Sequence, residues 1–514
     1  MPRPDTVPMG AAPLVGTSPL VGADPIGDST LRQPAIADRV GSHRSWAGAS
    51  VAAALMSLGL SACSLAPAYK TPDVPVAEQY ANAATPWTEA KPADHIDRNG
   101  WWKLYGDPRL DELQAKLVAN NATLAAALAH YEQSEAFTRQ VRAGLFPQIG
   151  LNGNATRNRE SDTRPLRGAT SPAYYNSYTI GAQLDYEVDL WGRVRDSVAA
   201  GTAEQAASAA DLASVRLSLQ AQLADSYLQL NGFDRQIKVL SESIDAFTHA
   251  LELTQSRHDG GIASGLDVAR AQTQLSNAKS QLTQAQAQRG LVQHAIAVLV
   301  GESASTFTLA TDDDTVHVPT IPLEVPSLIL QRRPDIAAAE RRTAAANARV
   351  GIARSAFFPQ LTLDAQGGWQ SSAWGSIATA PNRFWSIGPT LFLSVFDGGR
   401  RKAGVDAAKA ATEEAGAQYR GVVLNAFAQV EDNLTLLRDL GAALTDQRAA
   451  ADAAQRSVDL SLNRYREGAV GYLDVVQAQT DALDARRSVI DLETRQLRAS
   501  VQLIRALGGG WSNS

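Results

Sequence analysis

LDVARAQT at residues 266–273 and LDVVQAQT at residues 473–480 are identical at six of eight positions and lie 207 residues apart. Gly261 and Gly468, which precede the two octets, keep the same offset. Two similar stretches at one fixed distance predict a duplicated unit. Two copies are too few for a solenoid, which needs about three or more repeats to bury its faces.

The similarity extends upstream from the octets. LFPQI at 145–149 matches FFPQL at 357–361, with an offset of 212. Each copy contains a helix, an FPQ motif, two alternating segments, a Gly-Arg turn, a very long helix, a glycine turn and a return helix. We predict a first repeat at 106–300, a linker or equatorial segment at 301–329, a second repeat at 330–508 and a tail at 509–514.

Two segments without proline, 193–258 and 400–466, predict long helices. One apolar column of the first helix, with a spacing of seven, contains Leu223, Leu230, Ile237, Ile244 and Leu251. A sustained seven-residue repeat requires a partner helix. We expect the return helices at 265–300 and 472–507 to be the partners. In the second long helix, polar residues such as Asn433 and Gln447 occupy positions of a seven-residue column that is apolar in the first. We therefore expect the second hairpin to face water near a lumen.

Other segments alternate between apolar and polar residues, which is typical of half-buried strands. We expect strands at about 148–159, 176–189, 360–369 and 384–396. An ordinary four-stranded sheet that covers a helical core would show the same alternation. Four strands are fewer than the roughly eight of the smallest membrane barrels, and lipid does not tolerate open sheet edges. If these strands span a membrane, several chains must contribute to one barrel.

Composition and motifs exclude several classes of protein. The net charge of -6 gives no electrostatic reason to expect a nucleic-acid partner. The single cysteine excludes an internal disulfide and a CxxC metal site. The histidines show no metal-binding spacing, and GIASG at 261–265 does not fit the GxSxG nucleophile elbow. We therefore expect no enzyme, no cofactor and no metal site.

The cysteine, Cys63, directly follows a predicted export signal at 44–62. A basic segment precedes an apolar run and the small residues of LSAC, as in a secretory signal. A buried apolar helix with an incidental thiol is the alternative. An export signal normally begins a chain, so our hypothesis is that the gene is shorter than the extension at 1–43 implies and that translation starts near Val40. We expect 63–105 to be a lipidated N-terminal periplasmic segment.

LSAC resembles the bacterial lipobox, in which the cysteine becomes the lipidated first residue of the mature protein. The resemblance implies that Cys63 carries lipid, including palmitate. Ser64 follows it, in place of the aspartate that commonly retains lipoproteins in the inner membrane. The resemblance therefore implies an outer-membrane destination.

The mature chain resembles the outer-membrane factor family, the TolC-like exit ducts of tripartite efflux pumps. The resemblance runs from WWKLYGDPRLDEL at 101–113 to LIRALGGGW at 503–511 and is most specific at 330–361. With the lipobox, it is strongest to the lipoprotein branch that serves resistance-nodulation-division pumps. It implies a mainly α fold with a small β part and a homotrimer, whose twelve-stranded outer-membrane β-barrel continues into a twelve-helix periplasmic α-barrel.

The same resemblance implies the partners and the activity. The partners are a periplasmic membrane-fusion adaptor protein, an inner-membrane efflux pump and outer-membrane lipid. The activity is passive conduction of small molecules, such as drugs or toxic compounds, across the periplasm and outer membrane. Two alternatives stay open, namely a channel for type I protein secretion and a lipid-anchored periplasmic coiled-coil scaffold. The scaffold leaves the strands and the repeated FPQ motif unexplained.

The resemblance also assigns roles to the two glycine turns. They are docking tips for the adaptor and comprise Gly261, Ile262, Ala263, Ser264, Gly265, Gly468, Ala469, Val470, Gly471 and Tyr472. Ser264 followed by Asp267 predicts a capping box, and Asp267 and Asp474 are both predicted helix caps.

Two residues are implied to form the periplasmic gate. Three copies of Asp474 would make an acidic ring, and Tyr465 would help to hold the inner hairpin shut. Val470 and Gln477 depart from the family pattern, where some members carry a bridging arginine and a second acid. The sequence therefore predicts a weaker lock of the closed state.

Overall fold

The computed structural model describes residues 64–74, 100–164, 168, 170, 172–312, 316–319 and 332–509. All of them belong to one compact unit, residues 62–514. Several predicted features lie outside the described residues: the extension at 1–43, the signal at 44–62, Cys63, residues 313–315 and 320–329 of the linker, and the tail after residue 509.

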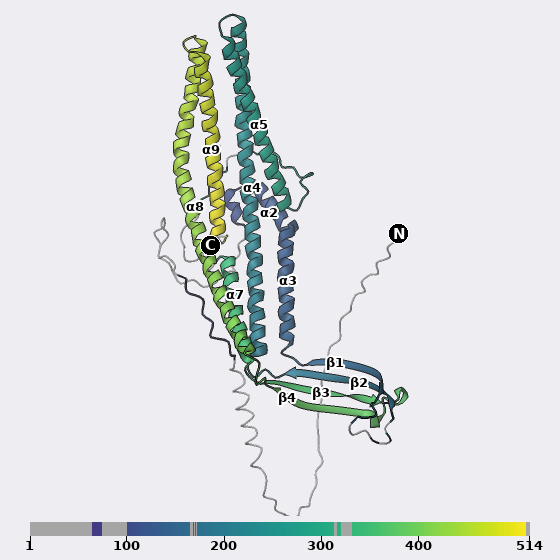
Figure 1. Ribbon diagram of the computed structural model, residues 1–514. Coiled ribbons are helices and arrows are strands. Elements are labelled where there is room, and N and C mark those ends of the chain that lie inside the picture. Colours follow the sequence, from purple (N-terminus) through teal and green to yellow (C-terminus); the bar gives the residue numbers. More distant parts are fainter. Residues whose placement is uncertain are drawn as a thin grey trace, which may run out of the picture. The chain divides into compact units, whose positions relative to one another are not determined.

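The described elements follow the duplicated order that the sequence predicts (Figure 1). η1 (Trp101–Tyr105) and α2 (Pro108–Asn120) come first. The first series is α3 (Ala122–Ala143), β1 (Gln148–Arg159), β2 (Tyr174–Glu187), α4 (Arg193–Asp259) and α5 (Gly265–Leu299). The second series is α7 (Pro334–Ser355), β3 (Gln360–Ser371), β4 (Arg383–Phe392), α8 (Arg400–Arg466) and α9 (Tyr472–Ala506), with η2 (Trp374–Ser376) and η3 (Ala380–Asn382) between β3 and β4.

Glycines set the ends of the helices. Gly192 precedes α4 with a φ of 80°, and Gly399 precedes α8 with a φ of 92°. Each long helix has 67 residues and is therefore about 100 Å long. The return helices end one residue earlier than predicted, because Gly301 and Gly508 adopt the left-handed conformation that terminates helices.

The strands of the described chain form one antiparallel sheet in the order β1-β2-β3-β4. β1 has its predicted bounds. β4 ends at Phe392, so the predicted end at residue 396 is wrong. Phe392 pairs with Gln360. The next partner would be Pro359, which has no N–H to continue the ladder.

The other two strands differ from the prediction by two residues at an end. β2 is shifted toward the N-terminus, because its first residue, Tyr174, pairs with the last residue of β1, Arg159. β3 extends to Ser371, because that residue pairs with Tyr178 of β2. In both cases the neighbouring strand, rather than local alternation, sets the boundary.

α4 has different partners along its length. Thr138 of α3 donates a hydrogen bond to the carbonyl oxygen of Gly201, and α7 contributes an ion pair from Arg342 to Asp211. Closer to the turn between α4 and α5, α4 packs against α5, and Arg289 of α5 pairs with Asp234 of α4. The return helix is a partner of the long helix, as predicted, but α3 and α7 pack against α4 as well. α5, with 35 residues, covers only part of α4.

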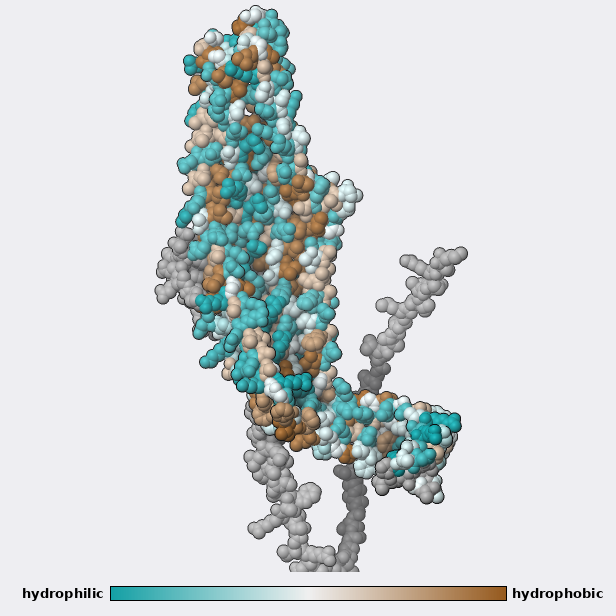
Figure 2. Space-filling view, viewed as in Figure 1, coloured by the Kyte–Doolittle hydropathy of each residue, from teal (hydrophilic) through white to brown (hydrophobic). Residues whose placement is uncertain are grey.

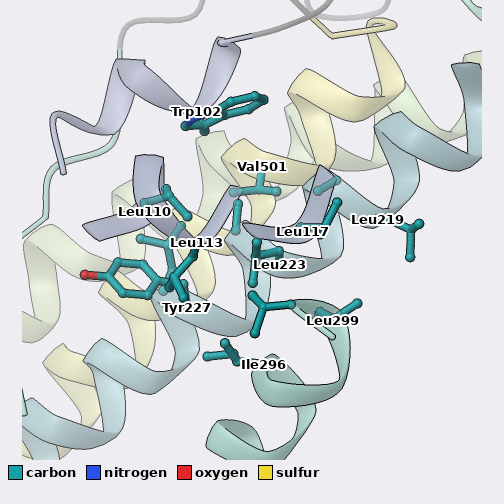
Figure 3. Packing of buried hydrophobic residues seen from close by; sticks show 14 of the residues in the cluster. Trp102, Leu110, Leu113, Leu117, Leu219, Leu223, Tyr227, Ile296, Leu299 and Val501 are labelled. Atoms are coloured by element: carbon teal, nitrogen blue, oxygen red, sulfur yellow. The ribbon is translucent and has the colours of Figure 1, made fainter. Parts of the chain in front are cut away.

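The largest apolar core lies where the return helices end (Figure 3). Its labelled members come from four parts of the chain: Trp102, Leu110, Leu113, Leu117, Leu219, Leu223, Tyr227, Ile296, Leu299 and Val501. Val501 belongs to the second repeat and packs with residues of the first. The core therefore fixes the two repeats to each other at mid-length of α4.

Each return helix ends against the first helix of its own repeat. Asn121 is the N-cap of α3, and its Nδ2 donates a 2.8 Å hydrogen bond to the carbonyl oxygen of Leu299, the last residue of α5. In the second repeat Arg333 precedes α7, and its Nη1 donates a 3.0 Å hydrogen bond to the carbonyl oxygen of Ala506, the last residue of α9. We call these contacts the first joint and the second joint.

Residues 64–74, here called the strap, bind along α7 and the start of α4. Ser64 Oγ donates a 2.6 Å hydrogen bond to Asp196 Oδ1. Asn347 Nδ2 and Arg354 Nη1 of α7 donate to strap carbonyl oxygens, at 2.7 and 3.0 Å. A Cβ at Gly351 would lie 2.2 Å from Asp196 Oδ2, so only glycine fits beneath the strap at this point.

Candidate functional site

The sheet exposes apolar side chains on one face. On β1, Leu151 is 88% exposed, and on β4, Trp385 is 79% exposed, with Ile387 and Leu391 at alternate positions also exposed. None of the apolar clusters of the described chain contains a strand residue. The alternative of an ordinary sheet over a helical core is therefore wrong. Exposed apolar surface of this kind marks a membrane or protein contact.

Apolar side chains also gather where the strands join the helices (Figure 2). Phe146 precedes β1, and Val395 and Phe396 follow β4; these three side chains are 67%, 89% and 90% exposed. The apolar surface thus continues from the sheet onto its connections.

Within the described ranges, no helix has both the length and the apolar character needed to cross a membrane. The same ranges contain no group of three or more His, Cys, Asp or Glu side chains that could hold a metal ion.

The first tip is the turn between α4 and α5. Gly261 adopts a φ of 74°, and Ile262 beside it is 78% exposed. Ser264 is the N-cap of α5 and forms the predicted capping box. Its Oγ accepts from Asp267 N at 3.2 Å, and its own N donates to Asp267 Oδ2 at 3.3 Å. The side chains therefore satisfy donors at the start of α5.

The second tip is the turn between α8 and α9. Gly468 adopts a φ of 77°, and Gly471 is the N-cap of α9. The prediction that the Asp474 side chain caps this helix is wrong, because no side-chain cap bond is present and glycine has no oxygen to complete a box. Asp474 is exposed in the first turn, where its charge still complements the helix dipole.

Arg257, near the end of α4, fastens the first tip to the second. Its Nη1 donates to the carbonyl oxygen of Tyr465 at 2.9 Å, and its Nη2 donates to that of Arg466 at 3.0 Å. Its guanidinium also lies 4.5 Å from the centre of the Tyr465 ring. The arginine thus satisfies terminal carbonyls of α8 and stacks on an aromatic face.

Tyr465 and Tyr472 pack together in the second tip and make its apolar contact with Ala271 of the first hairpin. Their ring centres are 5.3 Å apart, and they pack with Ala271 and Val475. Burial raises the pKa of Tyr472 to about 12. The Tyr472 side chain is only 2% exposed, so the structure does not place it on the exposed turn with the other predicted docking residues.

Sequence reasoning missed Arg257 as a site residue. Its repeat counterpart, Arg464, is also an arginine in the last turn of a long helix, but it is exposed. The sequence feature that could have indicated this role is the basic residue in the last turn of each long helix. Only the structure shows which of the two reaches the neighbouring hairpin.

A groove separates α5 from α9 below the tips. It has a volume of about 410 Å³, and its lining is mainly apolar or small and includes Leu266, Ala269, Thr273, Leu473, Val476 and Leu483. Arg270 and Asp484 also line it. We call it the α5–α9 groove.

Glu493 of α9 forms a second tie between the hairpins. It accepts hydrogen bonds from Arg235 of α4 at 2.5 Å and from Arg448 of α8 at 2.6 Å. Burial alone would raise the pKa of this carboxyl, but the hydrogen bonds from Arg448 and Arg235 outweigh burial and hold the pKa below its usual range. The charged carboxylate therefore stabilises the contact among three helices.

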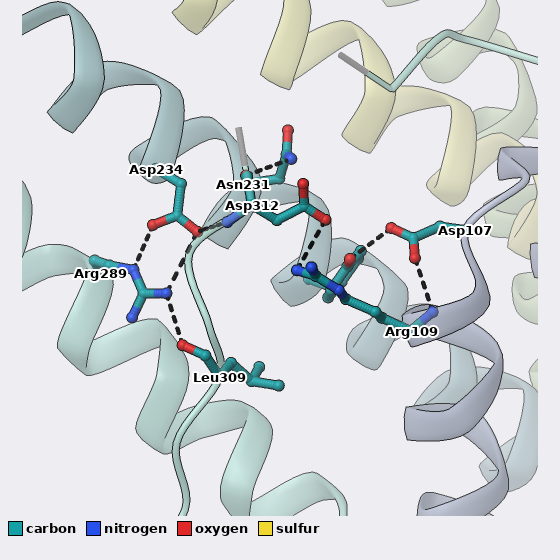
Figure 4. Close-up of polar contacts among 8 residues, drawn as sticks. Asp107, Arg109, Asn231, Asp234, Arg289, Leu309 and Asp312 are labelled. Atoms are coloured by element: carbon teal, nitrogen blue, oxygen red, sulfur yellow. Dashed lines mark hydrogen bonds and ion pairs between the residues drawn. The ribbon is translucent and has the colours of Figure 1, made fainter. Parts of the chain in front are cut away.

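A polar network fixes the segment after α5 to α4 (Figure 4). Asp234 pairs with Arg289 and accepts a 3.1 Å hydrogen bond from Asp312 N. Arg109 of α2 reaches the Asp312 carboxylate at 3.1 Å, and Asp107 accepts a hydrogen bond from Tyr227. These contacts hold the first hairpin to α2 and to the segment after α5.

The family follows from a direct comparison of the sequence. A family model described as outer membrane efflux protein matches residues 113–302 and 325–509, which together form most of the chain. The chain belongs to this family. The two matched segments correspond to the two series of elements, and the predicted family resemblance is confirmed.

Comparison with individual relatives supports the same family assignment. Two proteins of Pseudomonas aeruginosa are similar: the pyoverdine export outer membrane protein OpmQ is 34% identical over 427 residues, covering 82% of this chain and 89% of the relative. The outer membrane protein OprJ is 32% identical over 464 residues, covering 90% and 96%. The crystal structure of the outer membrane protein VceC from Vibrio cholerae superposes with a TM-score of 0.75 at 28% identity, covering 80% of this chain and 98% of VceC.

These findings confirm the general function. The chain is an outer membrane efflux protein with a long periplasmic extension and is a component of an efflux pump. It is a duct of this family and not an enzyme. The mainly helical fold with a small sheet is that of the family's channels.

Proposed function

We propose that three copies of this chain form one duct, with a twelve-stranded barrel in the outer membrane and a twelve-helix tunnel in the periplasm. The observation that carries this proposal is the open four-stranded sheet with an exposed apolar face. β1 and β4 are edge strands, and lipid does not tolerate unpaired backbone groups. Pairing β1 of one chain with β4 of the next removes every edge when three chains close the ring.

The N-terminus would be anchored in the same membrane. Lipidated Cys63 would precede the strap, whose first residue is held by Asp196 near the start of α4. That position is just beyond the sheet in the chain, next to the exposed apolar connections. Several acyl chains on Cys63 would give firm anchoring, whereas one chain binds a membrane only marginally.

The tips would bind the helical hairpins of a periplasmic adaptor that links the duct to an inner-membrane pump. Ile262, Leu266 and Leu473 are exposed apolar side chains at the tips. The α5–α9 groove beside them suits the apolar face of an amphipathic helix. Residues Gly261 to Gly265 and Gly468 to Gly471 would make the contacts around this groove.

Asp474 and Tyr465 would form the gate at the periplasmic entrance. Asp474 is exposed, so three copies around an axis would repel one another and attract cations. Tyr465, stacked under Arg257, would hold the second hairpin against the first in the closed state. Opening would move the second hairpin away from the axis. Transport through the open duct would be passive, with energy supplied by the pump.

The proposed substrates are small organic molecules, including drugs and toxic compounds. OpmQ is named for pyoverdine export, which is consistent with cargo of this size. The gate residues act on the width and charge of the entrance, so the pump rather than the duct would select the cargo.

Single-channel conductance in a planar bilayer tests this proposal. We expect a small conductance for the mature wild-type protein and a larger one for Asp474→Ala, with less block by divalent cations. Asp446→Ala, which removes an exposed acid of α8 away from the tip, serves as the control. Equal conductance of Asp474→Ala and wild type would reject the gate but keep the duct. Absence of any conductance from folded protein would reject the duct.

A further inference from the structure

The second joint lines a small polar cavity, open to solvent on one side, that the duct function does not use. It has a volume of about 120 Å³ and lies between α4, the start of α7 and the end of α9. Its wall includes Arg333, Asp335, Gln429 and Arg505, together with the hydroxyl-bearing residues Ser214 and Ser218 of α4. One water molecule needs only about 10–15 Å³ of such space, so the cavity has room for a larger polar ligand.

The two arginines of this cavity differ in how their donors are used. Arg333 is satisfied, because it donates to both carboxylate oxygens of Asp335, to Gln429 Oε1 and to the carbonyl oxygen of Ala506. Arg505 is not. Its Nε is buried, and no described residue places a hydrogen-bond acceptor against that atom. Because this Nε has almost no accessible surface, a ligand in the cavity would bind the other N–H groups of the Arg505 guanidinium, with which no described residue forms a hydrogen bond or ion pair.

The electrostatics of the cavity favour an anion. Two guanidinium groups face one carboxylate, that of Asp335, which leaves the wall positively charged. Burial and the charge of Arg333 lower the pKa of Arg505, and the carboxylates of Asp335 and Asp225 oppose this shift only in part. α7, a helix of 22 residues, begins at this cavity with no side-chain cap, and its dipole adds to the positive potential.

The first joint provides an internal comparison. At the offsets of the repeat, Asn121 stands where the second joint has Arg333, and Val298 stands where it has Arg505. At the first joint the neutral side chain of Asn121 makes the hydrogen bond to the end of α5, and no arginine takes part in it. Two arginines are therefore not required for joining the helix ends, and the charge of the second joint needs a separate reason.

We infer that this cavity binds a small inorganic oxyanion, such as phosphate or sulfate. The Arg505 guanidinium supplies paired N–H donors, a geometry that matches two oxygens of a tetrahedral anion. Ser214 and Ser218 of α4 also line the cavity and carry hydroxyl groups, and Arg333 supplies charge while remaining bonded to Asp335. The bound anion joins the last turn of α9 to α4 and α7, at the level where the hairpins begin.

Equilibrium dialysis with radiolabelled phosphate tests the site directly. Detergent-solubilised mature protein is dialysed at constant ionic strength, set with sodium chloride, so that non-specific charge effects are equal in every sample. We expect saturable binding of one phosphate per chain in the wild type, with competition by sulfate. Arg505→Gln should weaken binding by about tenfold or more, because it removes a charge-assisted pair of hydrogen bonds.

Two further variants make the result decisive. Arg495→Gln removes another arginine of α9, one that is 53% exposed and pairs with Asp491, and it should bind phosphate as the wild type does. Arg505→Lys keeps the charge but loses the paired donors, and its affinity should lie between those of wild type and Arg505→Gln. Circular dichroism in phosphate-free buffer checks that each variant is folded. Absence of saturable binding in the wild type, or equal affinity in Arg505→Gln, would overturn the site.

Discussion

Asn121 and Leu299 are 178 residues apart in the chain and are joined by a 2.8 Å hydrogen bond from Asn121 Nδ2 to the carbonyl oxygen of Leu299. The same side chain caps α3, because its Oδ1 accepts from Leu124 N at 2.9 Å. One asparagine thus satisfies the end of one helix and the start of another. Both contacts are needed because helix ends carry unsatisfied backbone groups.

Replacing Asn121 with alanine should therefore destabilise the protein by about 2 kcal/mol, since it removes a helix cap and a buried hydrogen bond. Thermal unfolding followed by circular dichroism measures the effect as a lower midpoint. Asn425→Ala is the matched control, because Asn425 is exposed within α8 and alanine is the better helix former. Equal midpoints for the two variants would show that the first joint contributes no stability.

A capping box can be installed at the second tip. Gly471 has a φ of -79°, which serine adopts without strain, and a Cβ there meets no atom within 4 Å. Gly471→Ser would place a serine three residues before Asp474, as Ser264 precedes Asp267 in the first tip. We expect the first turn of α9 to gain roughly 0.5–1 kcal/mol.

Hydrogen exchange of peptides from this turn, followed by mass spectrometry, should be slower in Gly471→Ser than in wild type. Gly468→Ser is the opposing control, because the φ of 77° at Gly468 strains any residue with a side chain. Faster exchange is expected in that variant. Unchanged exchange in Gly471→Ser would mean that no capping box forms.

Arg257 should hold the tips together in the resting state. Arg257→Ala removes two hydrogen bonds to α8 and the contact with the Tyr465 ring. If the tips form the entrance of the duct, the resting conductance should rise as it does for Asp474→Ala. Arg456→Ala, at an exposed position of α8, should leave conductance unchanged. A wild-type conductance in Arg257→Ala would limit the arginine to a packing role.

Acid should weaken the tie at Glu493. Its pKa is depressed in the folded state, so its contribution is fully present above the unfolded value of about 4.3 and is lost as the pH falls through the folded pKa. Glu493→Gln leaves Arg235 mostly buried without a charged partner. We expect the variant to unfold at a lower temperature than wild type at pH 7, with a difference that shrinks as the pH falls below about 4.

Unfolding midpoints of both proteins between pH 7 and pH 3 make this comparison. Asp446→Asn serves as the control, because that acid is exposed and should show no pH-dependent difference. A Glu493→Gln deficit that stays constant across the range would show that the carboxylate charge is not the stabilising feature.

Local patterns predicted most of the fold because long helices and glycine turns depend on nearby residues. The bounds of α8 were predicted from the absence of proline and from the glycines at its ends. The end of β4 was not predicted, because it depends on Pro359, which directly precedes the facing strand β3. The end of a strand depends on its pairing with the neighbouring strand, and local sequence patterns do not reveal the register of that pairing.

The candidate site was predictable only in part. The capping box of Ser264 and Asp267 is a local motif, and the structure contains it. Arg257, Asn121 and Glu493 act on helices that are distant in sequence, so their partners could not be read from local spacing. The repeat could even mislead. The first tip has Ser264 as the N-cap, but the second tip has Gly471 at the equivalent place, and glycine has no side chain to form a capping box.

The strap sets an order of events in the making of this protein. Its contacts reach across 132 residues from Ser64 to Asp196 and across 289 residues from Leu65 to Arg354. Loops of this length are costly to close before the surface that receives them exists. The strap is synthesised early, yet its binding surface is incomplete until α7 has been made and folded against α4. The segment that follows the proposed lipid anchor is therefore among the first parts of the chain to be synthesised and among the last to reach its final position.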